Sequence, residues 1–309
     1  MLTFLIRPMR VPEDCAYVAH ITNAYRGGDL TAEGVVEMVR DLPPEGIQYR
    51  LVAEDQAGRL IGHAFAYRLP HHTPGRFIVR VQTTEPEFRG CGVGTGLCQA
   101  IDRFAREQGA AFLDGEVRDN DPAGLEWAQH RGFGILDHVF ESVLDLARFD
   151  PAPFAGAMDA TGLRFARLTE FPPEEGLRQL YALEKATAPD NPAYDSPEFV
   201  AFHTWQKELP RPEHILVALD GDRFAGVTMI EPNPAGTSFY THYTGVRREY
   251  RGRGVALALK LLGIDLAREA GAVSMRTNND STNAPMLAVN RKLGYTPIPG
   301  WYGLRKLLT

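Results

Sequence analysis

The sequence is poor in cysteine and contains no long apolar run. Its three cysteines, Cys15, Cys91 and Cys98, are too few for a disulfide framework and have no metal-ligand spacing, so we expect no metal site. No stretch approaches the roughly 20 apolar residues that a membrane-spanning helix needs. The N-terminal residues become charged too early for a signal peptide. These absences favour a cytoplasmic protein with no membrane partner.

Positive charge is also scarce. Lys and Arg together number 33, against 39 Asp and Glu, which gives a net charge of −6. Non-specific binding to nucleic acid depends on neutralising phosphates with Lys and Arg, so we expect no nucleic-acid partner. With 44% apolar and 23% charged residues, the composition is that of a globular protein, and 309 residues suit two domains of about 150 residues.

The stretch from Thr241 to Ala256 combines a strand pattern, a glycine turn and the start of a helix. β-Branched and aromatic residues from 239 to 246 indicate a strand. The turn that follows consists of Arg251, Gly252, Arg253 and Gly254. After the turn, apolar residues recur at helical spacing, at Val255, Leu259, Leu262 and Leu266.

A glycine turn at the start of a helix can bind an anion through its main chain. The first amides of a helix have no intrahelical partner, and the helix dipole favours negative charge beside them. Glycine lets the backbone approach a pyrophosphate because no β-carbon intervenes. The stretch therefore predicts a cradle for a phosphate-bearing cofactor, although a solvated loop fits the isolated pattern equally well.

The same pattern occurs a second time, 162 positions earlier (251 minus 89). In this first copy, Arg89 aligns with Arg251, Gly90 with Gly252, Gly92 with Gly254, and Gly94 with Ala256. Further along, Gly132-Phe133 aligns with Gly294-Tyr295. A repeat of this length is a whole domain. The chain is therefore predicted to contain two copies of one domain.

We expect the first copy at residues 1–148, a linker at 149–161 and the second copy at 162–309. The linker is rich in proline, glycine and small residues and has no clear period. Each copy is expected to follow the order β-α-α-β-β-β-α-β-α-β-β. The predicted class is α/β (α+β), with two mixed, mostly antiparallel sheets, each flanked by helices on both faces.

This order of elements, with Arg-x-x-Gly-x-Gly/Ala between the fourth strand and the third helix, resembles the GNAT acetyltransferase superfamily. The resemblance covers nearly the whole chain, twice. It is most specific in the second copy, where Asn283 precedes a short helix that ends at Gly294-Tyr295. The tandem arrangement is similar to that of the mycothiol synthase family.

The resemblance implies that acetyl-CoA is the cosubstrate. Its pyrophosphate would be held by the amides of Arg251, Gly252, Arg253, Gly254, Val255 and Ala256. The main chain of Thr244, Gly245 and Val246 would bind the pantetheine arm and the thioester carbonyl, where the fourth and fifth strands separate. Asn283 is expected to cap its helix, and the family pattern adds a contact with the cofactor arm. Arg89, Gly90, Gly92 and Gly94 would form the equivalent turn of the first copy.

Acetyl transfer to an amine needs a base, a donor to the oxyanion and a stabilised thiolate. Counting back in twos from Val246 places Thr244, His242 and Tyr240 on one face of the strand. We expect His242 to be the base, because an imidazole accepts a proton near neutral pH. Glu231, at the end of the preceding strand, is the alternative base. A histidine that only packs and a solvated strand-end carboxylate are the corresponding structural alternatives.

The leaving thiolate lacks its usual partner. Family members often carry a tyrosine four residues before the Gly-Phe/Tyr pair, where this chain has Asn290 and, in the first copy, Ala128. Asparagine can donate a hydrogen bond to sulfur but cannot donate a proton at neutral pH. Tyr240 or Tyr243 could substitute, with packing in the core as the alternative for both.

The second copy also carries candidate walls for an acceptor. Aromatic rings together with carboxylates suit a substrate that bears an amine. The candidates are Tyr181, Tyr194, Phe202, His203 and Trp205 with Glu184, Asp190 and Asp195, and near the closing strands Trp301 and Tyr302.

Only the second copy is expected to be catalytic. The first copy has Arg80 and Gln82 where the second has His242 and Thr244, and an arginine cannot act as a base. We therefore predict an N-acetyltransferase that acts on a primary amine of a small molecule, with its active site in the C-terminal copy. The alternative is a non-catalytic acetyl-CoA sensor or interaction protein. The sequence leaves the acceptor and the oligomeric state open.

Overall fold

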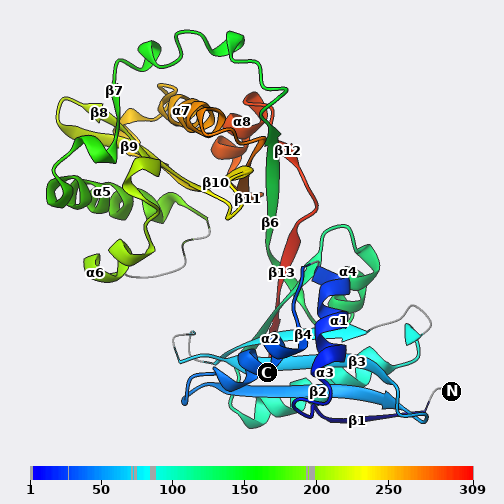
Figure 1. Cartoon of the computed structure of the whole chain (residues 1–309). Coiled ribbons are helices and arrows are strands. Elements are labelled where there is room, and N and C mark those ends of the chain that lie inside the picture. The colour runs from blue at the N-terminus through cyan, green and yellow to red at the C-terminus, as the bar shows by residue number, and fades with distance from the viewer. Residues whose placement is uncertain are drawn as a thin grey trace. The chain divides into compact units, whose positions relative to one another are not determined.

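The computed structural model describes the chain except for residues 1–2, 27, 71, 73–74, 84–87, 193, 195–198 and 309, and the side chains of 80–83. The chain forms two compact units (Figure 1). Unit 1 comprises Met1–Leu136 together with Tyr302–Thr309, and unit 2 comprises Asp137–Trp301.

Unit 1 is a sheet with helices on both faces. Its strands pair in the order β1 (Phe4–Pro8), β2 (Ile47–Asp55), β3 (Leu60–Arg68), β4 (Arg76–Thr83), β5 (Phe112–Arg118) and β13 (Trp301–Leu307). The first three pairs are antiparallel and β4 runs parallel to β5. Its helices are α1 (Cys15–Arg26), α2 (Ala32–Arg40), α3 (Val93–Glu107) and α4 (Pro122–Gln129).

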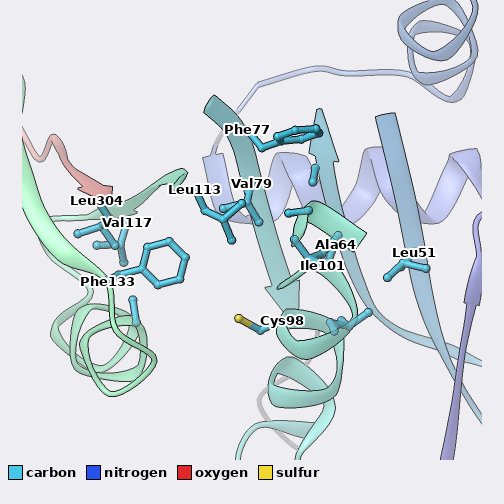
Figure 2. Packing of buried hydrophobic residues seen from close by; sticks show 14 of the residues in the cluster. Leu51, Ala64, Phe77, Val79, Cys98, Ile101, Leu113, Val117, Phe133 and Leu304 are labelled. Carbon is cyan, nitrogen blue, oxygen red and sulfur yellow. The ribbon is translucent and has the colours of Figure 1, made fainter. Parts of the chain in front are cut away.

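The two faces of the unit 1 sheet follow from the alternation of side chains along β2. Leu51 packs in a core that contains Ile101 of α3, whereas its neighbour Val52 packs against Val18 of α1 and Val35 of α2. Figure 2 shows Leu51, Ala64, Phe77 and Val79 from the strands beside Cys98 and Ile101. Helix α3 therefore covers one face, and α1 with α2 covers the other.

The closing strands are exchanged between the two units. Leu304 of β13 lies in the unit 1 core beside Val117 and Phe133 (Figure 2), and Arg305 donates to both oxygens of Asp114 at 2.7 and 2.8 Å. Conversely, β6 (Gly134–Asp145) pairs with β11 in unit 2.

The compact units therefore differ from the expected domains 1–148 and 162–309. The physical reason is that both copies provide a similar sheet edge, and an unpaired edge accepts any strand of suitable pattern. The repeat in the sequence shows that each copy has a closing strand, but it does not show in which unit that strand pairs.

Unit 2 repeats the architecture. Its strands pair in the order β6, β11 (Ser274–Asp280), β10 (Ser238–Val246), β9 (Arg223–Pro232), β8 (Ile215–Asp220) and β7 (Arg164–Arg167), and β12 (Thr296–Pro297) pairs with β6. Its helices are α5 (Pro173–Thr187), α6 (Phe202–Trp205), α7 (Val255–Glu269) and α8 (Ala284–Lys292). Short 3-10 turns occupy Ala152–Phe154, Asp159–Thr161, Leu168–Glu170, Ala188–Asp190, Gln206–Glu208, Pro212–His214 and Arg248–Tyr250.

The second helix of unit 2 is short. Among the described residues from 199 onward it consists of the four residues of α6, which the 3-10 turn Gln206–Glu208 follows.

Strand β8 shows how the unit 2 sheet is covered. Ile215, Val217 and Leu219 pack in the core that contains Leu180 and Leu183 of α5. The intervening Leu216 and Ala218 pack against Val255 and Leu259 of α7. Figure 1 shows α5 and α7 on opposite sides of these strands. Across the described ranges, no helix combines the length and apolar character that crossing a bilayer requires.

Candidate active site

The glycine turn before α7 has the conformation that an anion cradle requires. Gly252 and Gly254 have φ angles of 74° and 81°, in the left-handed region that glycine adopts without steric cost. A β-carbon at either position would meet no heavy atom within 4 Å, so no side chain fills the space beside the turn. Gly254 supplies no side-chain cap, which leaves the first amides of α7 for another acceptor.

The first copy has the same turn. Gly90 and Gly92 have φ angles of 74° and 90°, and α3 begins directly after them, with Gly94 in its first turn. A β-carbon at Gly90 or Gly92 would also meet open space, and Arg89 is exposed. The repeat found in the sequence therefore extends to the backbone conformation of both turns.

The arginine side chains of the second turn hold the turn onto unit 2. Arg251 Nε donates to the Val246 carbonyl at 3.0 Å, and Arg251 Nη2 donates to Asp190 Oδ2 at 2.6 Å. Hydrogen bonds from Arg248 and Arg251 lower the pKa of Asp190 to about 2. Arg253 Nη2 donates to the Thr161 carbonyl at 2.7 Å. With both side chains committed to the protein, a ligand would meet the main-chain amides of the turn.

Strand β10 contains a β-bulge at His242. Thr241 pairs with Ile230 and Tyr243 pairs with Met229, the next residue of β9, so His242 is the extra residue. Because of the bulge, Phe239 and Val246 both pack on the α7 side of the sheet, although their positions differ by an odd number (246 minus 239). The expectation that His242 and Tyr240 share a face with Thr244 and Val246 is therefore wrong, since counting in twos holds only for a strand without a bulge.

The bulge brings the three catalytic candidates together. His242 Nε2 lies 3.0 Å from Glu231 Oε2, and the ring centroids of His242 and Tyr240 are 5.0 Å apart. Glu231 pairs directly with Tyr240 across β9 and β10. When the imidazole is neutral and Nε2–H donates to Glu231, Nδ1 is the ring atom that can accept a proton. Burial raises the pKa of the Tyr240 hydroxyl, so this group stays protonated.

Tyr243 is committed to a different contact. Its hydroxyl lies 2.7 Å from Thr187 Oγ1 of α5, and the Thr187 hydroxyl donates to the Leu183 carbonyl at 3.0 Å. Thr187 has only one hydroxyl proton, so Tyr243 must donate in this pair. Burial raises the pKa of Tyr243 to about 12. Its proton is therefore directed at α5.

The two asparagines of the second copy have different environments. Asn283 caps α8, as its Oδ1 accepts a hydrogen bond from the Met286 amide at 3.3 Å. Asn290 is 2% exposed, and its Nδ2 donates to Asn279 Oδ1 at 2.7 Å. Asn290 therefore lies in a buried polar network, and its Oδ1 has no hydrogen-bond partner among the described residues.

Strands β10 and β11 separate beside the bulge. Their parallel pairing runs from Ser238 with Ser274 to Thr241 with Thr277 and then stops. Beyond this point β10 continues along β9 to Val246, while β11 continues along β6 to Asp280. We call the divergence after Thr241 and Thr277 the fork. An open glycine turn, a bulge and a fork in one unit suit a nucleotide cosubstrate with a long arm.

The first copy has the turn but no bulge over its described pairing. Strand β4 pairs with β3 from Ile78 with Tyr67 to Thr83 with Gly62 in unbroken register. The side chains of Arg80 and Gln82 lie outside the described residues, so only their backbone bears on the comparison. The two copies thus differ in strand register at the position where the second copy carries His242.

Much of the expected acceptor wall is core. The ring of Tyr181 packs within 5.3 Å of the rings of Phe199, Phe202 and Trp205. Trp205 Nε1 donates to Glu184 Oε2 at 2.8 Å, and burial raises the pKa of Glu184. Asp195 lies outside the described residues.

Comparisons with known proteins agree with this geometry. A model of the acetyltransferase (GNAT) family matches residues 18–133 and again residues 177–295. N-alpha-acetyltransferase 30 of Schizosaccharomyces pombe is 29% identical over 96 residues, which are 30% of this chain and 60% of that protein.

Solved structures match over the full length of the chain. A GCN5-related N-acetyltransferase from Sphaerobacter thermophilus has a TM-score of 0.70 at 23% identity, covering 100% of this chain and 97% of its own. A tandem GNAT protein from the clavulanic acid biosynthesis pathway has a TM-score of 0.61 at 22% identity, covering 100% and 99%. At these identities the two structures show a shared tandem fold. With one family match in each copy, the chain belongs to the GNAT family of acetyltransferases, enzymes whose cosubstrate is acetyl-CoA.

Proposed function

We propose that the second copy transfers an acetyl group from acetyl-CoA to a primary amine of a small molecule, and that the first copy is not catalytic. The observation that carries this proposal is the 3.0 Å contact between His242 Nε2 and Glu231 Oε2 at the bulge of β10. The fork and the open glycine turn belong to the same unit. The first copy has an open turn but an unbroken register in β4.

The glycine turn and the fork would bind acetyl-CoA. The free amides that begin at Gly254 and the dipole of α7 would hold the pyrophosphate. The Thr244 hydroxyl is held by Thr228 Oγ1 at 2.8 Å, so Thr244 would act through its main chain. Acetyl-CoA, once bound, supplies the activated acyl group. A backbone amide near the bulge would donate to the oxyanion that develops on the thioester.

His242 and Glu231 account for proton removal. The acceptor amine must be neutral to attack, and His242 would take its proton while Glu231 orients the ring and balances the positive charge that forms. The side chains of His242 and Glu231 are 45% and 51% exposed. A pair so exposed adds little to stability, which favours a role in chemistry over a role in folding.

The surroundings narrow the acceptor to a small cationic amine. The carboxylate of Asp190 is neutralised by two arginines, and that of Glu184 is partly buried against Trp205. Glu231 is then the carboxylate beside the bulge that can attract an ammonium group. We place the reaction in the cytoplasm because all three cysteines are free thiols, which suits a reducing compartment.

A panel of small amines assayed for release of CoA thiol tests this function. Replacing His242 with alanine should lower kcat by about 10²- to 10⁴-fold and leave the affinity for acetyl-CoA unchanged. An unchanged kcat would remove His242 from the mechanism.

Paired substitutions compare the two copies. Gly254→Val should abolish turnover, because a side chain at this φ strains the turn and fills the cradle. Gly92→Val is the matched control and should leave turnover in place. The opposite result would assign the reaction to the first copy.

The second candidate is a non-catalytic acetyl-CoA sensor. The replacement of the family's usual tyrosine by Asn290 favours it. Acetyl-CoA binding without thiol release for any amine in the panel would support the sensor over the enzyme.

A further inference from the structure

Lys260 is buried in α7 with no hydrogen-bond or ion-pair partner among the described residues. The residue is 3% exposed, and its Nζ has no hydrogen bond within the described parts of the chain. A buried ammonium group without a counter-charge is costly, and an apolar residue would suit this position better. Burial alone lowers the pKa of Lys260 to about 7. A residue that lowers stability in this way is expected to have a role other than packing.

The Lys260 amine lies against a ring whose hydroxyl approaches both strands of the fork. Its Nζ is 5.2 Å from the centre of the Tyr295 ring, which follows α8. The Tyr295 hydroxyl contacts Met275 Sδ of β11 at 3.9 Å and lies next to the Thr241 side chain of β10. Thr241 belongs to the last pair before the two strands separate, and Met275 lies two residues before Thr277 on β11. The Lys260 amine is therefore linked to both strands of the fork through the Tyr295 ring.

No described side chain in contact with Lys260 supplies a negative charge to neutralise its ammonium group. Tyr295 is the titratable side chain in contact with it, and burial raises the pKa of Tyr295, so Tyr295 remains a neutral hydroxyl. No charged side chain of the described residues contributes to the lowered pKa of Lys260. An anion that enters the fork would thus be the first counter-charge that Lys260 meets.

The leaving thiolate has no other proton donor among the residues considered for that role. Asn290 cannot donate a proton at neutral pH, and its amide is already bonded to Asn279. Tyr243 directs its proton at Thr187. Tyr240 lies with His242 at the bulge, on the face of the sheet opposite to α7.

We propose that Lys260 stabilises the departing CoA thiolate and donates a proton to it, an inference that rests on the proposed function of the second copy. The amine nitrogen forms a bond to the thioester carbonyl carbon, and the proton on that nitrogen passes to His242. The carbon–sulfur bond then breaks with its electron pair on sulfur. The sulfur takes a proton from Lys260 Nζ, which gives the CoA thiol and a neutral lysine that solvent reprotonates.

The chemistry suits this lysine. A general acid is most effective when its pKa lies near the working pH. An ordinary lysine, with a pKa of about 10.4, holds its proton too tightly, whereas burial lowers the pKa of Lys260 to about 7. A free thiol of the cysteine type titrates at about 8.5, so the transfer from Lys260 to the thiolate is downhill.

Ligand binding tests the proposal without turnover. We would measure CoA and desulfo-CoA, which lacks the thiol, by calorimetry at pH 6, where the Lys260 amine carries its proton, with the full chain and with Lys260→Met. The wild-type chain should bind CoA about tenfold more tightly than desulfo-CoA, because a charged donor contacts the sulfur. Lys260→Met should lose this preference and bind desulfo-CoA as before. Lys292→Met, which removes an exposed lysine of α8, is the matched control and should keep the preference.

Single-turnover kinetics provide the second readout. Lys260→Met should slow acetyl transfer by about 10²- to 10⁴-fold. In the wild-type chain the acid must be protonated, so its contribution to the rate should fall as pH rises through about 7, and this decline should be absent from Lys260→Met.

The outcomes separate this proposal from the proposed function. If Lys260→Met keeps both the preference for CoA and the decline in rate, Lys260 is not the acid, while the enzyme assignment stands. If the wild-type chain binds neither CoA nor desulfo-CoA, the proposed function fails and the role of Lys260 fails with it. A titration of the Lys260 amine by NMR in the wild-type chain avoids any question of folding. The amine signal should respond to CoA and not to desulfo-CoA, and equal responses would overturn the proposal.

Discussion

Replacing Lys260 with methionine should stabilise unit 2 below about pH 7, and the gain should disappear in alkaline solution. The lysine is 3% exposed and has no partner for its Nζ in the described structure. Methionine has a similar length and fills the same space without an amine. The substitution therefore removes a buried charge and leaves no large cavity.

The size of the effect follows from the lowered pKa. Folding moves the pKa of Lys260 from 10.5 to about 7, and each pH unit corresponds to about 1.4 kcal/mol. The product, roughly 5 kcal/mol, is the ceiling for the penalty. Local relaxation and water penetration reduce such penalties in real proteins, so we expect a gain of about 2–3 kcal/mol.

The sign of the pH dependence can be worked out directly. Between pH 7 and 10.5 the unfolded chain binds a proton that the folded chain does not, so the stability of the wild-type chain rises with pH through this range. Below about pH 7 both states are protonated and the penalty is complete. Above 10.5 both states are neutral and the penalty vanishes. The gain in stability from Lys260→Met should therefore decrease as pH rises through the same range.

Denaturant unfolding at a series of pH values measures the gain. Because the chain has two compact units, the assay should follow unit 2 alone. Trp205 is buried in the core between α5 and the sheet, so its fluorescence in a Trp127→Phe, Trp301→Phe background reports that unit. Lys292→Met should show no gain. An unchanged stability of Lys260→Met, or a gain that persists undiminished above pH 10.5, would refute the reasoning.

Three further predictions test other parts of the structure. Leu304→Ala should destabilise unit 1 by about 2–4 kcal/mol, measured by Trp127 fluorescence, although residue 304 belongs to the second copy; loss confined to unit 2 would contradict the strand exchange. Asp190→Asn should weaken acetyl-CoA binding several-fold in calorimetry, because Arg251 loses its carboxylate partner, and an unchanged affinity would show that the turn needs no such support. Tyr243→Phe should lower the free energy of unfolding by about 1 kcal/mol and leave kcat nearly unchanged, because its proton is directed at Thr187; a large loss of kcat would instead make Tyr243 catalytic.

The sequence alone was sufficient for the local features of this protein. Apolar spacing at Val255, Leu259, Leu262 and Leu266 predicted the helix α7, and the offset of 162 positions predicted two copies that share their elements. The sequence predicted glycine turns in which no β-carbon blocks a ligand, and Gly90, Gly92, Gly252 and Gly254 have positive φ. These features depend on residues close together in the chain, so short-range patterns determine them.

Features that depend on distant partners required the tertiary structure. The bulge at His242 is a mismatch between β10 and β9, and nothing within β10 alone shows where the register shifts. For the same reason, counting in twos along β10 assigned the wrong face to Tyr240.

The pairing of β13 and the burial of Lys260 also depend on the tertiary structure. Both sheets have similar edges, so the destination of β13 depends on the core around Leu304 and on the ion pair between Arg305 and Asp114. Lys260 follows Leu259 on α7, where its sequence neighbours suggest an ordinary charged residue at a helix surface. In the folded chain it is buried, and its amine lies against the ring of Tyr295, 35 positions later (295 minus 260). Local sequence thus determined the elements and the glycine turns, whereas long-range packing decided the register, the strand exchange and the environment of the buried amine.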